Sequence, residues 1–552
     1  MRVLGVNAVF HDPAAALIVD GQIVAAAEEE RFSRRKHGKT ATAFSTWELP
    51  ERAATWCLAE AGLSPADLDA VGYSYDPDLA PQSDGDITQD AWEGLRTLYA
   101  RRAPKFLQTA LPGLDPECVR FVPHHLAHAA SAHLAGPFAR SSVMVLDGRG
   151  ERTSYLAGRY ADGDFEPLAT QELPHSLGLL YEDVTEHLGF KRASDEYKVM
   201  AMASYGVPSF LATFREAIRV TAEGGFVVDR EQLDLSPFAE RLEPGADWTP
   251  AHADLAATMQ ARLQEVLLEL ACWVHQRTGD PYLTMAGGVA LNCVANSYLD
   301  ERGPFERIWV QPAAGDAGTA LGAALHVARE LGDDVRPMPT AALGRKWTDE
   351  ELGHWLDDAA VAHERPDDIA EACADLIAAN HVVAWFQGRS EYGPRALGHR
   401  SLLANPADPD NLTRLNDIKG REQFRPVAPM VLLERAPEIF EGPLPSPFML
   451  FTQRVRPGWT DRIPAVVHVD GTARIQTVDE ADEPRVAQLL RALEHRTGVP
   501  VAVNTSLNTA GRPMVDDPRD ALECFGSAPI AALAIGPYLV RRPDFVRSGG
   551  AA

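Results

Sequence analysis

Few features of this sequence point to a secreted or membrane-bound protein. Its 552 residues include six cysteines, none in a CxxC pair, so neither a disulfide framework nor a thiolate zinc site is indicated. No apolar run reaches the roughly 18 residues of a membrane-spanning helix. The start, MRVLGVNAVF, lacks the basic segment and long apolar core of a signal peptide. We expect a cytoplasmic protein without a membrane partner.

Basic residues are also outnumbered. The chain has 52 Lys and Arg residues against 78 Asp and Glu residues, which gives a formal net charge of -26. This balance disfavours nucleic acids and anionic membrane surfaces as partners. The rest of the composition, 45% hydrophobic and 24% charged, is ordinary for a globular protein. Because 552 residues exceed what one core usually holds, we expect two or three domains.

The strongest chemical signal lies in PHHLAHAASAHLAGPFARSSVMVLDGRG, residues 123–150. His124 and His128 are four residues apart on an alanine-rich stretch, so both lie on one face of a predicted helix. The β-branched run 142–146 then leads Asp147 into a glycine turn. Two imidazoles and a carboxylate suit a divalent metal ion with mixed nitrogen and oxygen ligands. The alternative is a pair of helix-surface histidines beside a turn aspartate.

A strand–turn–strand pattern occurs twice. Residues 2–7, 14–19 and 23–27 are predicted strands, and Asp20-Gly21 signals a hairpin between the last two. The pattern returns at residues 142–160, which predicts a duplicated architecture. His11 stands at the mouth of the first strands. The charge-dense segment that follows, residues 28–38, contains Lys36 and is either a phosphate-facing loop or a solvated charged face.

Residues 76–120 hold no motif, and we interpret them as an insertion that shapes a substrate pocket. Further on, an amphipathic helix at 255–279 precedes a buried strand at 282–286. Gly287 and Gly288 follow that strand, where backbone N–H groups can approach a phosphate closely. Asp316 lies in a second small-residue loop before a helix and could supply another carboxylate to the metal.

Residues 332–347, rich in Pro, Gly and Asp, are the predicted linker. The part after it concentrates positive charge among glycines and prolines, in QGRSEYGPRALGHRSL and NDIKGREQFRPVAP. Guanidinium groups bind oxyanions bidentately, so this cluster predicts an anion site rather than a basic solvated face. A later strand leads into Asn504 and Ser506, at an edge where α/β sheets bind ligands. The cationic cluster comprises Arg389, Arg395, Arg400, Lys419, Arg421, Arg425 and Arg474.

In combination, FHDPAAALIVDG, EEERFSRRKHG, HHLAHAASA, VLDGRG, AGGVALN, GDAGTALGAAL, QGRSEYGPRALGHRSL, FRPVAP, TARIQTV and VNTSLN resemble the O-carbamoyltransferase family. That family includes the nodulation, cephalosporin and tobramycin carbamoyltransferases, and the resemblance covers almost the whole chain. It implies an α/β protein of two domains. Residues 1–340 would form a duplicated actin/sugar-kinase-like (ASKHA) transfer domain similar to the tRNA threonylcarbamoyl-transfer domain. Residues 341–552 would form a YrdC-like domain that makes an acyl-adenylate.

The resemblance further implies a reaction. Carbamoyl phosphate and ATP-Mg would give carbamoyl-adenylate, whose carbamoyl group would pass to a hydroxyl of a small-molecule natural product, as in antibiotic tailoring. Iron or zinc would be the metal, and a homodimer is one expectation for the assembly. A tRNA threonylcarbamoyl-transferase-like enzyme and a non-catalytic ATP-binding regulator of the ASKHA class are the alternatives, and the acceptor scaffold stays open.

The implied site residues fall into four groups. His11 would be the general base and Lys36 would stabilise developing charge. The metal ligands would be His124, His128, Asp147 and Asp316. The adenylate would contact Gly148, Gly150, Gly287, Gly288 and Asn292. Carbamoyl phosphate and ATP would contact Arg389, Arg395, Arg400, Ser401, Lys419, Arg421, Arg425, Arg474, Asn504 and Ser506.

Overall fold

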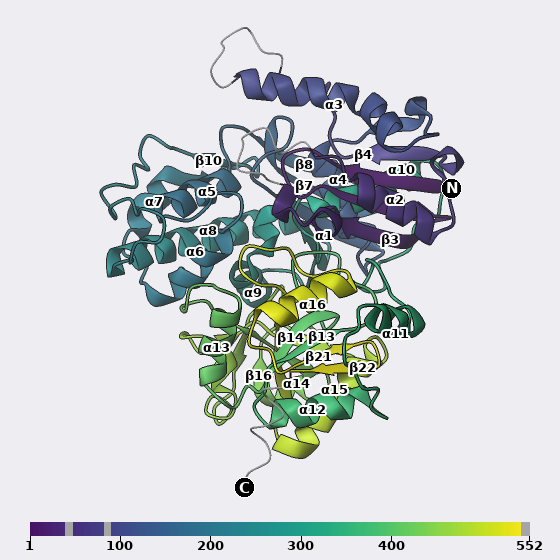
Figure 1. Ribbon diagram of the computed structural model, residues 1–552. Coiled ribbons are helices and arrows are strands. Elements are labelled where there is room, and N and C mark those ends of the chain that lie inside the picture. Colours follow the sequence, from purple (N-terminus) through teal and green to yellow (C-terminus); the bar gives the residue numbers. More distant parts are fainter. Residues whose placement is uncertain (39–47, 82–89, 543–552) are drawn as a thin grey trace. The chain divides into compact units, whose positions relative to one another are not determined.

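The computed structural model describes residues 1–38, 48–81 and 90–542 (Figure 1). The chain forms two compact units, Met1–Pro339 and Thr340–Ala552, while the sequence analysis placed the domain boundary after residue 340. Both units are built from β-sheets and helices. Within the described part of the chain, every helix is too short or too polar to cross a lipid bilayer.

The first unit opens with a five-stranded sheet in the order β3-β2-β1-β4-β5. The central strand β1 pairs antiparallel with β2 and parallel with β4, and β4 pairs parallel with β5. Asp20 and Gly21 have φ angles of 49° and 77° and form the predicted hairpin turn. The elements are β1 (Arg2–Asn7), β2 (Ala14–Val19), β3 (Gln22–Glu28), α1 (Glu30–Ser33), α2 (Glu51–Glu60), β4 (Ala70–Tyr73), α3 (Asp90–Ala110) and β5 (Val119–Phe121).

A second five-stranded sheet repeats this topology in the order β12-β11-β6-β7-β8. Its central strand β6 pairs antiparallel with β7 and parallel with β11, which pairs parallel with β12. The repeat confirms the predicted duplicated α/β architecture, and its assignment to the actin and sugar-kinase class stays a prediction. The elements are α4 (His124–His133), β6 (Arg140–Leu146), β7 (Thr153–Ala161), β8 (Asp164–Glu172), α5 (Leu177–His187), α6 (Glu196–Met202), α7 (Leu211–Ala217), β9 (Ile218–Val220), β10 (Phe226–Val228), α8 (Pro250–Thr278), β11 (Tyr282–Ala286), α9 (Cys293–Arg302), β12 (Arg307–Val310) and α10 (Ala317–Glu330).

Two helices rich in small residues, α4 and α10, join the two halves of this unit. α4 follows the first sheet but packs on β6, β7 and β11 of the second, and α10 follows the second sheet but packs on β1, β2 and β4 of the first. The two helices also pack against each other. A Cβ atom on Gly5 of β1 would lie 1.8 Å from the carbonyl oxygen of Ala320 in α10, so the close approach requires glycine.

The prediction that residues 76–120 form an insertion is wrong. This segment contains α3 and reaches β5, so it is the connection between the parallel strands β4 and β5. Neighbouring parallel strands require such a crossover, usually through a helix. Sequence patterns did not indicate this role because β5 spans only three residues, Val119–Phe121, and is only partly buried.

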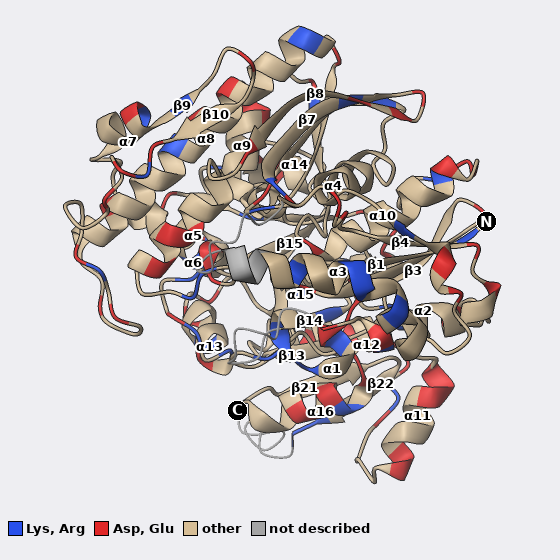
Figure 2. Cartoon of the chain, turned by 90° about the horizontal axis from the view of Figure 1, so that it is seen from above, with Lys and Arg blue, Asp and Glu red and all other residues tan. Residues whose placement is uncertain are grey.

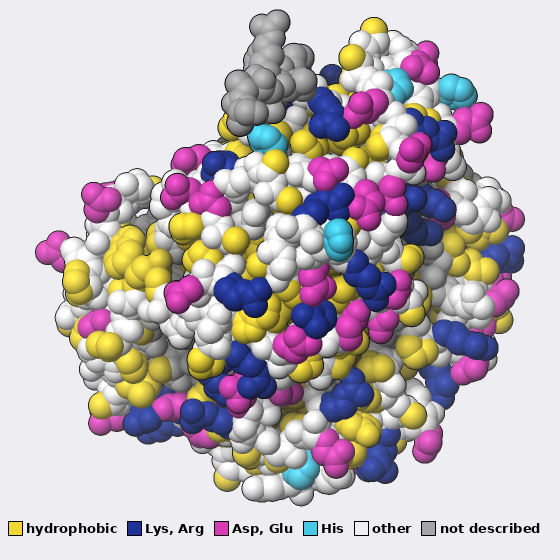
Figure 3. Space-filling view, turned by 90° about the horizontal axis from the view of Figure 1, so that it is seen from below, with side chains coloured by type: hydrophobic (Ala, Val, Ile, Leu, Met, Phe, Trp, Pro, Cys, Tyr) yellow, Lys and Arg dark blue, Asp and Glu magenta, His cyan; other side chains and the backbone are white. Residues whose placement is uncertain are grey.

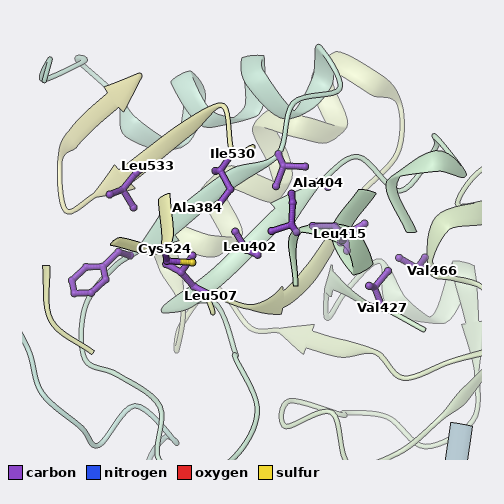
Figure 4. Packing of buried hydrophobic residues seen from close by; sticks show 14 of the residues in the cluster. Ala384, Leu402, Ala404, Leu415, Val427, Val466, Leu507, Cys524, Ile530 and Leu533 are labelled. Carbon is purple, nitrogen blue, oxygen red and sulfur yellow. The ribbon is translucent and has the colours of Figure 1, made fainter. Parts of the chain in front are cut away.

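The second unit contains a seven-stranded mixed sheet in the order β19-β15-β20-β14-β13-β21-β22. In β14, Leu402 and Ala404 join one apolar core, part of which Figure 4 shows, while Leu403 joins another. This alternation follows the two-residue period of a strand and shows that both faces of the sheet are covered. The predicted YrdC-like character of this unit stays a prediction.

The main elements of the second unit follow in chain order. β20 continues to Ser506, so Asn504 and Ser506 lie within a strand and not in the polar loop that the sequence indicated. The elements are α11 (Asp349–Asp358), α12 (Ile369–Ala378), β13 (Val383–Phe386), β14 (Arg400–Ala404), α13 (Asp410–Ile418), β15 (Ala428–Leu432), α14 (Ala436–Ile439), β16 (Phe440–Glu441), β17 (Gln453–Val455), β18 (Thr472–Ala473), β19 (Gln476–Val478), α15 (Pro484–Thr497), β20 (Val501–Ser506), α16 (Pro518–Ser527), β21 (Ala532–Ile535) and β22 (Tyr538–Arg541).

Charged side chains are spread along the chain. Figure 2 shows acidic residues on α11, whose first turn holds Asp349, Glu350 and Glu351, at the end where the helix dipole favours negative charge. On the face shown in Figure 3, Lys and Arg side chains are interspersed with Asp and Glu side chains. That face therefore presents no continuous basic area that a polyanion could cover.

Candidate metal centre and active site

Four side chains from distant segments of the first unit converge in its interior. His124 and His128 come from α4, Asp147 follows β6, and Asp316 precedes α10. One donor atom of each residue lies within 4.8 Å of the others. Both histidines are fully buried, and the carboxylates are nearly so. The alternative of surface histidines is therefore wrong.

The local backbone aims the two carboxylates inward. Asp147 Oδ1 accepts a hydrogen bond from the Gly288 N–H at 3.1 Å. Gly287 has a φ of 92°, and a Cβ atom there would lie 2.1 Å from the Leu146 carbonyl oxygen, so only glycine fits. Asp316 is the N-cap of α10 and faces the positive end of the helix dipole. The predicted glycine pair thus serves the metal centre by holding Asp147.

The donor spacing suits a metal ion better than direct hydrogen bonds. Asp147 Oδ2 lies 3.3 Å from His124 Nε2 and 3.5 Å from His128 Nε2. Asp316 Oδ1 lies 3.6 and 3.7 Å from the same two nitrogens. All four distances exceed the usual N–H···O limit of about 3.2 Å. Ligand bonds of about 2.1 Å would hold two donors about 3.0–3.4 Å apart.

Orphaned polar atoms support the same interpretation. His128 Nε2 and both carboxylate oxygens of Asp316 are buried and have no hydrogen-bond partner among residues 1–38, 48–81 and 90–542. Leaving a buried polar group unsatisfied costs about 1–3 kcal/mol. A divalent cation with nitrogen and oxygen ligands would satisfy all of these atoms at once.

Electrostatics favour a cation here as well. Burial alone would raise the pKa of Asp147, but the imidazoles of His124 and His128 hold it well below its usual value. Burial alone would lower the pKa of His124, yet Asp147 and Asp316 raise it well above its usual value. The two buried carboxylates thus create a field that favours positive charge between them. A divalent cation supplies that charge when both imidazoles are neutral.

His11 lies beside the four donors, in the loop after β1. Its Nε2 is 3.6 Å from Asp316 Oδ2, and its Nδ1 is 2.8 Å from Asp12 Oδ2. The His11 side chain is 27% exposed, so a substrate can reach it. Asn7, the last residue of β1, donates hydrogen bonds to the carbonyl oxygens of His11 and Asp12 at 2.9 and 3.0 Å. The loop is therefore fixed from within.

The predicted Lys36 lies in a short 3-10 turn and is half-buried. The neighbouring residue His37 places its Nδ1 2.6 Å from Asp12 Oδ1, so this turn adjoins the His11 loop. Glu28 and Arg31 of the same charged segment are buried. The alternative prediction, that this segment is a solvated charged face, is therefore wrong for these two residues.

The glycine turn after β6 is tightly surrounded beside Asp147, one of the four converging side chains. A Cβ atom on Gly148 would lie 3.2 Å from Glu182 Oε1, and one on Gly150 would lie 3.1 Å from the His125 ring. A larger side chain at either glycine would therefore press on Glu182 or on the His125 ring. Contact of Gly148 and Gly150 with an adenylate stays a prediction.

Asn292 has structural partners instead of an open side chain. It caps α9 by accepting the Ala295 N–H at 3.0 Å. Its amide also exchanges two hydrogen bonds with Gln260 of α8, at 2.8 and 3.1 Å. These contacts tie α9 to α8, so the predicted role of Asn292 in holding an adenylate gains no support from its geometry.

Glu151 is a residue of this site that the sequence analysis missed. It is buried, and its Oε1 accepts the backbone N–H groups of Asp76 and His124, both at 2.8 Å. This carboxylate fixes the first turn of α4 and with it His124. The signal in the sequence was an acidic residue directly after the Gly148–Gly150 turn.

In the second unit, Lys419 joins two residues at the end of β20. Its Nζ donates to Ser506 Oγ at 3.0 Å and to Asn508 Oδ1 at 2.5 Å. Lys419 is the C-cap of α13 and is largely buried. A largely buried ammonium with neutral partners is well suited to hold an anion.

Asn504 links this end of β20 to two other predicted segments. Its Nδ2 donates to the carbonyl oxygen of Ala396, next to Arg395, at 3.2 Å and to Gln476 Oε1 at 2.7 Å. Asn504 Oδ1 and Arg474 Nε are buried without a hydrogen-bond partner in the described chain. The structure thus brings the segments of Arg395, Arg474 and Asn504 together.

Arg400 serves the protein itself. It is fully buried, donates to the carbonyl oxygens of Gln387 and Gly388 at 2.8 and 3.3 Å, and lies 3.8 Å from the Phe386 ring centre. These contacts give it a structural role in place of the predicted ligand contact. The neighbouring Ser401, also fully buried, accepts a backbone N–H at 3.2 Å.

Three further predicted cations have protein partners. Arg389 donates to two backbone carbonyl oxygens, 2.9 and 3.0 Å away. Arg421 donates to Asn416 Oδ1 at 2.6 Å, and Arg425 lies 3.5 Å from Glu422 Oε2. These contacts hold the loops in place, and binding of an anion by these three residues stays a prediction.

Glu391 organises the glycine-rich loop of the second unit, and the sequence analysis overlooked it. Its Oε1 accepts the backbone N–H groups of Leu397, His399 and Arg400 at 2.7, 3.0 and 3.2 Å. Three N–H groups converge on one carboxylate oxygen that is fully buried. This residue therefore fixes the backbone around Arg395.

Comparison with known proteins agrees with this division of the chain. Residues 2–325 match the family model described as Carbamoyltransferase N-terminus, and residues 374–542 match Carbamoyltransferase C-terminus. The chain is 38% identical to nodulation protein NolNO of Sinorhizobium fredii over 97% of this chain and 80% of that protein. It is 32% identical to nodulation protein U of Rhizobium tropici over 95% of this chain and 93% of that protein.

Among solved structures, the crystal structure of T. kodakarensis HypF is similar to this chain. The match covers 60% of this chain and 48% of that chain, with 15% sequence identity and a TM-score of 0.39. This likeness is too weak to carry an argument about function.

Proposed function

The chain belongs to the carbamoyltransferase family, and on that premise we propose how its two units share the work. In the second unit, water cleaves carbamoyl phosphate to carbamate and phosphate. An oxygen of the carbamate then attacks the α-phosphorus of ATP-Mg, which gives carbamoyl-adenylate and releases pyrophosphate. The first unit transfers the carbamoyl group to a hydroxyl of a small-molecule natural product, and AMP leaves. The proposal rests on the two matched family models and on the separate sites in the two units.

His11 is the general base of the transfer step. The acceptor O–H gives its proton to His11 Nε2 while its oxygen attacks the carbamoyl carbon. The bond from this carbon to the phosphate oxygen breaks, and AMP leaves with the bonding electrons. An imidazole suits this task because its pKa lies near neutrality. Lys36, in the adjoining turn, stabilises the negative charge that develops.

His124, His128, Asp147 and Asp316 hold a divalent metal ion. Their buried and partly orphaned donor atoms support this assignment. When bound, the ion would supply Lewis-acid stabilisation of negative charge on the phosphate. Iron and zinc both accept nitrogen and oxygen ligands, so the donor set does not choose between them.

Lys419, Arg395 and Arg474, with Asn504 and Ser506, bind the anionic substrates in the second unit. Carbamoyl phosphate is small and doubly charged, so charge-assisted hydrogen bonds must supply its affinity. Arg474 Nε and Asn504 Oδ1 are buried and have no hydrogen-bond partner among the described residues, which supports this role because a ligand would complete their hydrogen bonds.

Beside the matched family models, one structural observation carries the proposal: four metal-type donors from three segments lie beside the partly exposed His11. The test is to incubate the purified protein with carbamoyl phosphate, ATP-Mg and a panel of hydroxylated compounds. We expect pyrophosphate and AMP that depend on carbamoyl phosphate, and an acceptor product with the mass of one added carbamoyl group. Activity that requires tRNA and threonine, or no AMP release at all, would contradict the proposal.

A further inference from the structure

Asp12 lies between two histidines that are far apart in the sequence. Its Oδ2 is 2.8 Å from His11 Nδ1, and its Oδ1 is 2.6 Å from His37 Nδ1. Each carboxylate oxygen thus faces the Nδ1 of a different ring. Of these three residues, only His11 was among the predicted site residues, and His37 was noted only as the end of a charged run that could reach a phosphate.

This arrangement fixes the tautomer of both rings. An ionised carboxylate only accepts hydrogen bonds, so both imidazoles must place a proton on Nδ1. The Nε2 of a neutral ring then carries a lone pair in place of a proton. For His11 this is the atom that faces Asp316, at 3.6 Å. Asp12 therefore presents the basic nitrogen of His11 to the metal centre.

The backbone around Asp12 is held in a strained shape. Phe10, Asp12 and His37 have φ angles of 62°, 51° and 60°, which are uncommon for residues other than glycine. Such conformations persist only where the surroundings enforce them, often at functional sites. The Asn7 side chain holds the backbone of the His11–Asp12 loop in this shape, because it donates hydrogen bonds to the carbonyl oxygens of both residues.

His37 is in turn anchored on its other side. Its backbone N–H donates to Glu30 Oε2 at 2.9 Å, and its carbonyl oxygen accepts the Asp12 N–H at 3.3 Å. Asp12, Glu30 and His37 also lie close enough to hold a metal ion. However, the Asp12–His37 contact of 2.6 Å has the length of a direct hydrogen bond, which leaves no room for an ion between these atoms.

We propose that Asp12 is a positioning residue that orients His11 and sets its tautomer, and that His37 holds Asp12 in place. The inference rests on the proposed role of His11 as general base. Loss of a carboxylate that orients a histidine base removes a large part of the rate that the histidine provides. The reason is that the wrong tautomer offers no lone pair to the substrate.

The main test is a double-mutant cycle with the full chain. The probe reaction uses carbamoyl phosphate, ATP-Mg and molar glycerol as the hydroxyl acceptor. We expect Asp12→Ala to lower kcat by about 100- to 10,000-fold, the usual range for a general base. The KM for glycerol should stay within about threefold, because binding is not the function lost.

The second arm of the cycle decides between positioning and general structure. In a His11→Ala background, Asp12→Ala should change kcat by less than about threefold, since Asp12 has no base left to orient. An equal loss in both backgrounds would overturn the proposal. His37→Ala should lower kcat less than Asp12→Ala does. In an Asp12→Ala background, His37→Ala should lower kcat no further.

A spectroscopic measurement tests the tautomer without any substrate. In protein with 15N-labelled histidine, the signal that disappears in His11→Ala belongs to His11. At about pH 8.5, where a free histidine is neutral, this signal should report a proton on Nδ1. Asp12→Ala should move the His11 population toward a proton on Nε2. An unchanged His11 spectrum would refute the inference, whatever the activity.

Two further variants complete the design. Asp12→Asn keeps the shape of the side chain, so it is the variant to use if Asp12→Ala folds poorly. Its single amide oxygen can accept a hydrogen bond from only one of the two rings, so the histidine spectrum should still change. Glu330→Ala is the matched control. It removes a carboxylate 3.3 Å from His326 on α10, and it should leave kcat unchanged. Absence of carbamoyl transfer in the unmutated protein would contradict the proposed function, while the His11 spectrum would still test Asp12.

Discussion

A Cβ atom on Gly322 would lie 1.7 Å from the carbonyl oxygen of Ala127, so α10 and α4 touch through their backbones. α4 carries His124 and His128, and α10 begins directly after Asp316. The packing of these two helices therefore sets the distance between three of the four metal-type donors.

Gly322→Ala should destabilise the first unit and weaken its metal centre. The added methyl group can be placed only if the helices separate, and overpacking of this kind costs about 1–3 kcal/mol or more. We expect a lower urea midpoint and a lower metal content in the purified protein. Gly94→Ala on α3 is the control, because no atom lies within 4 Å of its Cβ position. The control should be neutral or stabilising by up to about 1 kcal/mol. Equal metal content in Gly322→Ala and the unmutated protein would contradict the expectation.

His124→Ala and His128→Ala should each lose bound metal and carbamoyl transfer while the fold is retained. Removing one of four ligands lowers the affinity by at least the factor of about 10 to 100 that loss of a supporting residue causes. Metal content by mass spectrometry checks this, together with circular dichroism. His133→Gln, a buried residue of the same helix that pairs with Ser141 at 2.8 Å, should keep its metal. Undiminished metal in His128→Ala would defeat the assignment.

Lys419→Ala or Arg395→Ala should slow formation of carbamoyl-adenylate by roughly one and a half to three decades. Loss of one charge-assisted contact to a desolvated phosphate costs about 2–4 kcal/mol, or roughly one and a half to three decades in rate. Pyrophosphate release measures this step. Synthetic carbamoyl-adenylate should restore transfer in both variants, because the His11 site is intact.

The exposed Arg519 of the same unit provides the control, and Arg519→Ala should keep full activity. Full adenylation in Lys419→Ala and Arg395→Ala would show that these residues do not form the substrate site. Failure of the rescue with an intact fold would mean that the two half-reactions are not separable.

The contact between His399 and Glu483 should make the stability of the second unit depend on pH. His399 Nε2 lies 2.9 Å from Glu483 Oε1. Burial alone would lower the pKa of His399, but the hydrogen bond and charge of Glu483 outweigh it and raise the pKa. The stabilisation is therefore complete below the unfolded-state pKa of about 6.5 and is lost as the pH rises through the folded-state value.

Glu483→Gln should lower the free energy of unfolding of the second unit most at acidic pH, by about 1.5 kcal/mol for a hydrogen bond to a charged group. Urea denaturation measures this change. The difference from the unmutated protein should shrink as the pH rises. Glu480→Gln removes a nearby exposed carboxylate that pairs with Arg491 instead of a histidine, so its effect should not follow this trend. A difference that grows toward alkaline pH would have the wrong sign and would exclude the His399 contact as the cause.

The sequence alone determined the features that depend on local spacing. A separation of four residues placed His124 and His128 on one helix face. A strand-ending turn marked Asp147, and a small-residue loop before a helix marked Asp316. The duplicated architecture was visible because each half repeats the same short strands and turns. The period of the hydrophobic residues and the positions of the glycines depend only on neighbours in the chain, so both can be identified before the fold is known.

Only the tertiary structure decided which charged groups face a ligand and which face the protein. Arg400 and Arg395 are five residues apart in one glycine-rich motif, yet the Arg400 guanidinium is fully buried against backbone carbonyl oxygens. The pairing of Asp12 with His37 joins residues 25 positions apart. It depends on a strained backbone at both residues, which no local sequence pattern predicts. Burial and hydrogen-bond partners are set by segments that meet only on folding, and these contacts determine the role of each charged side chain.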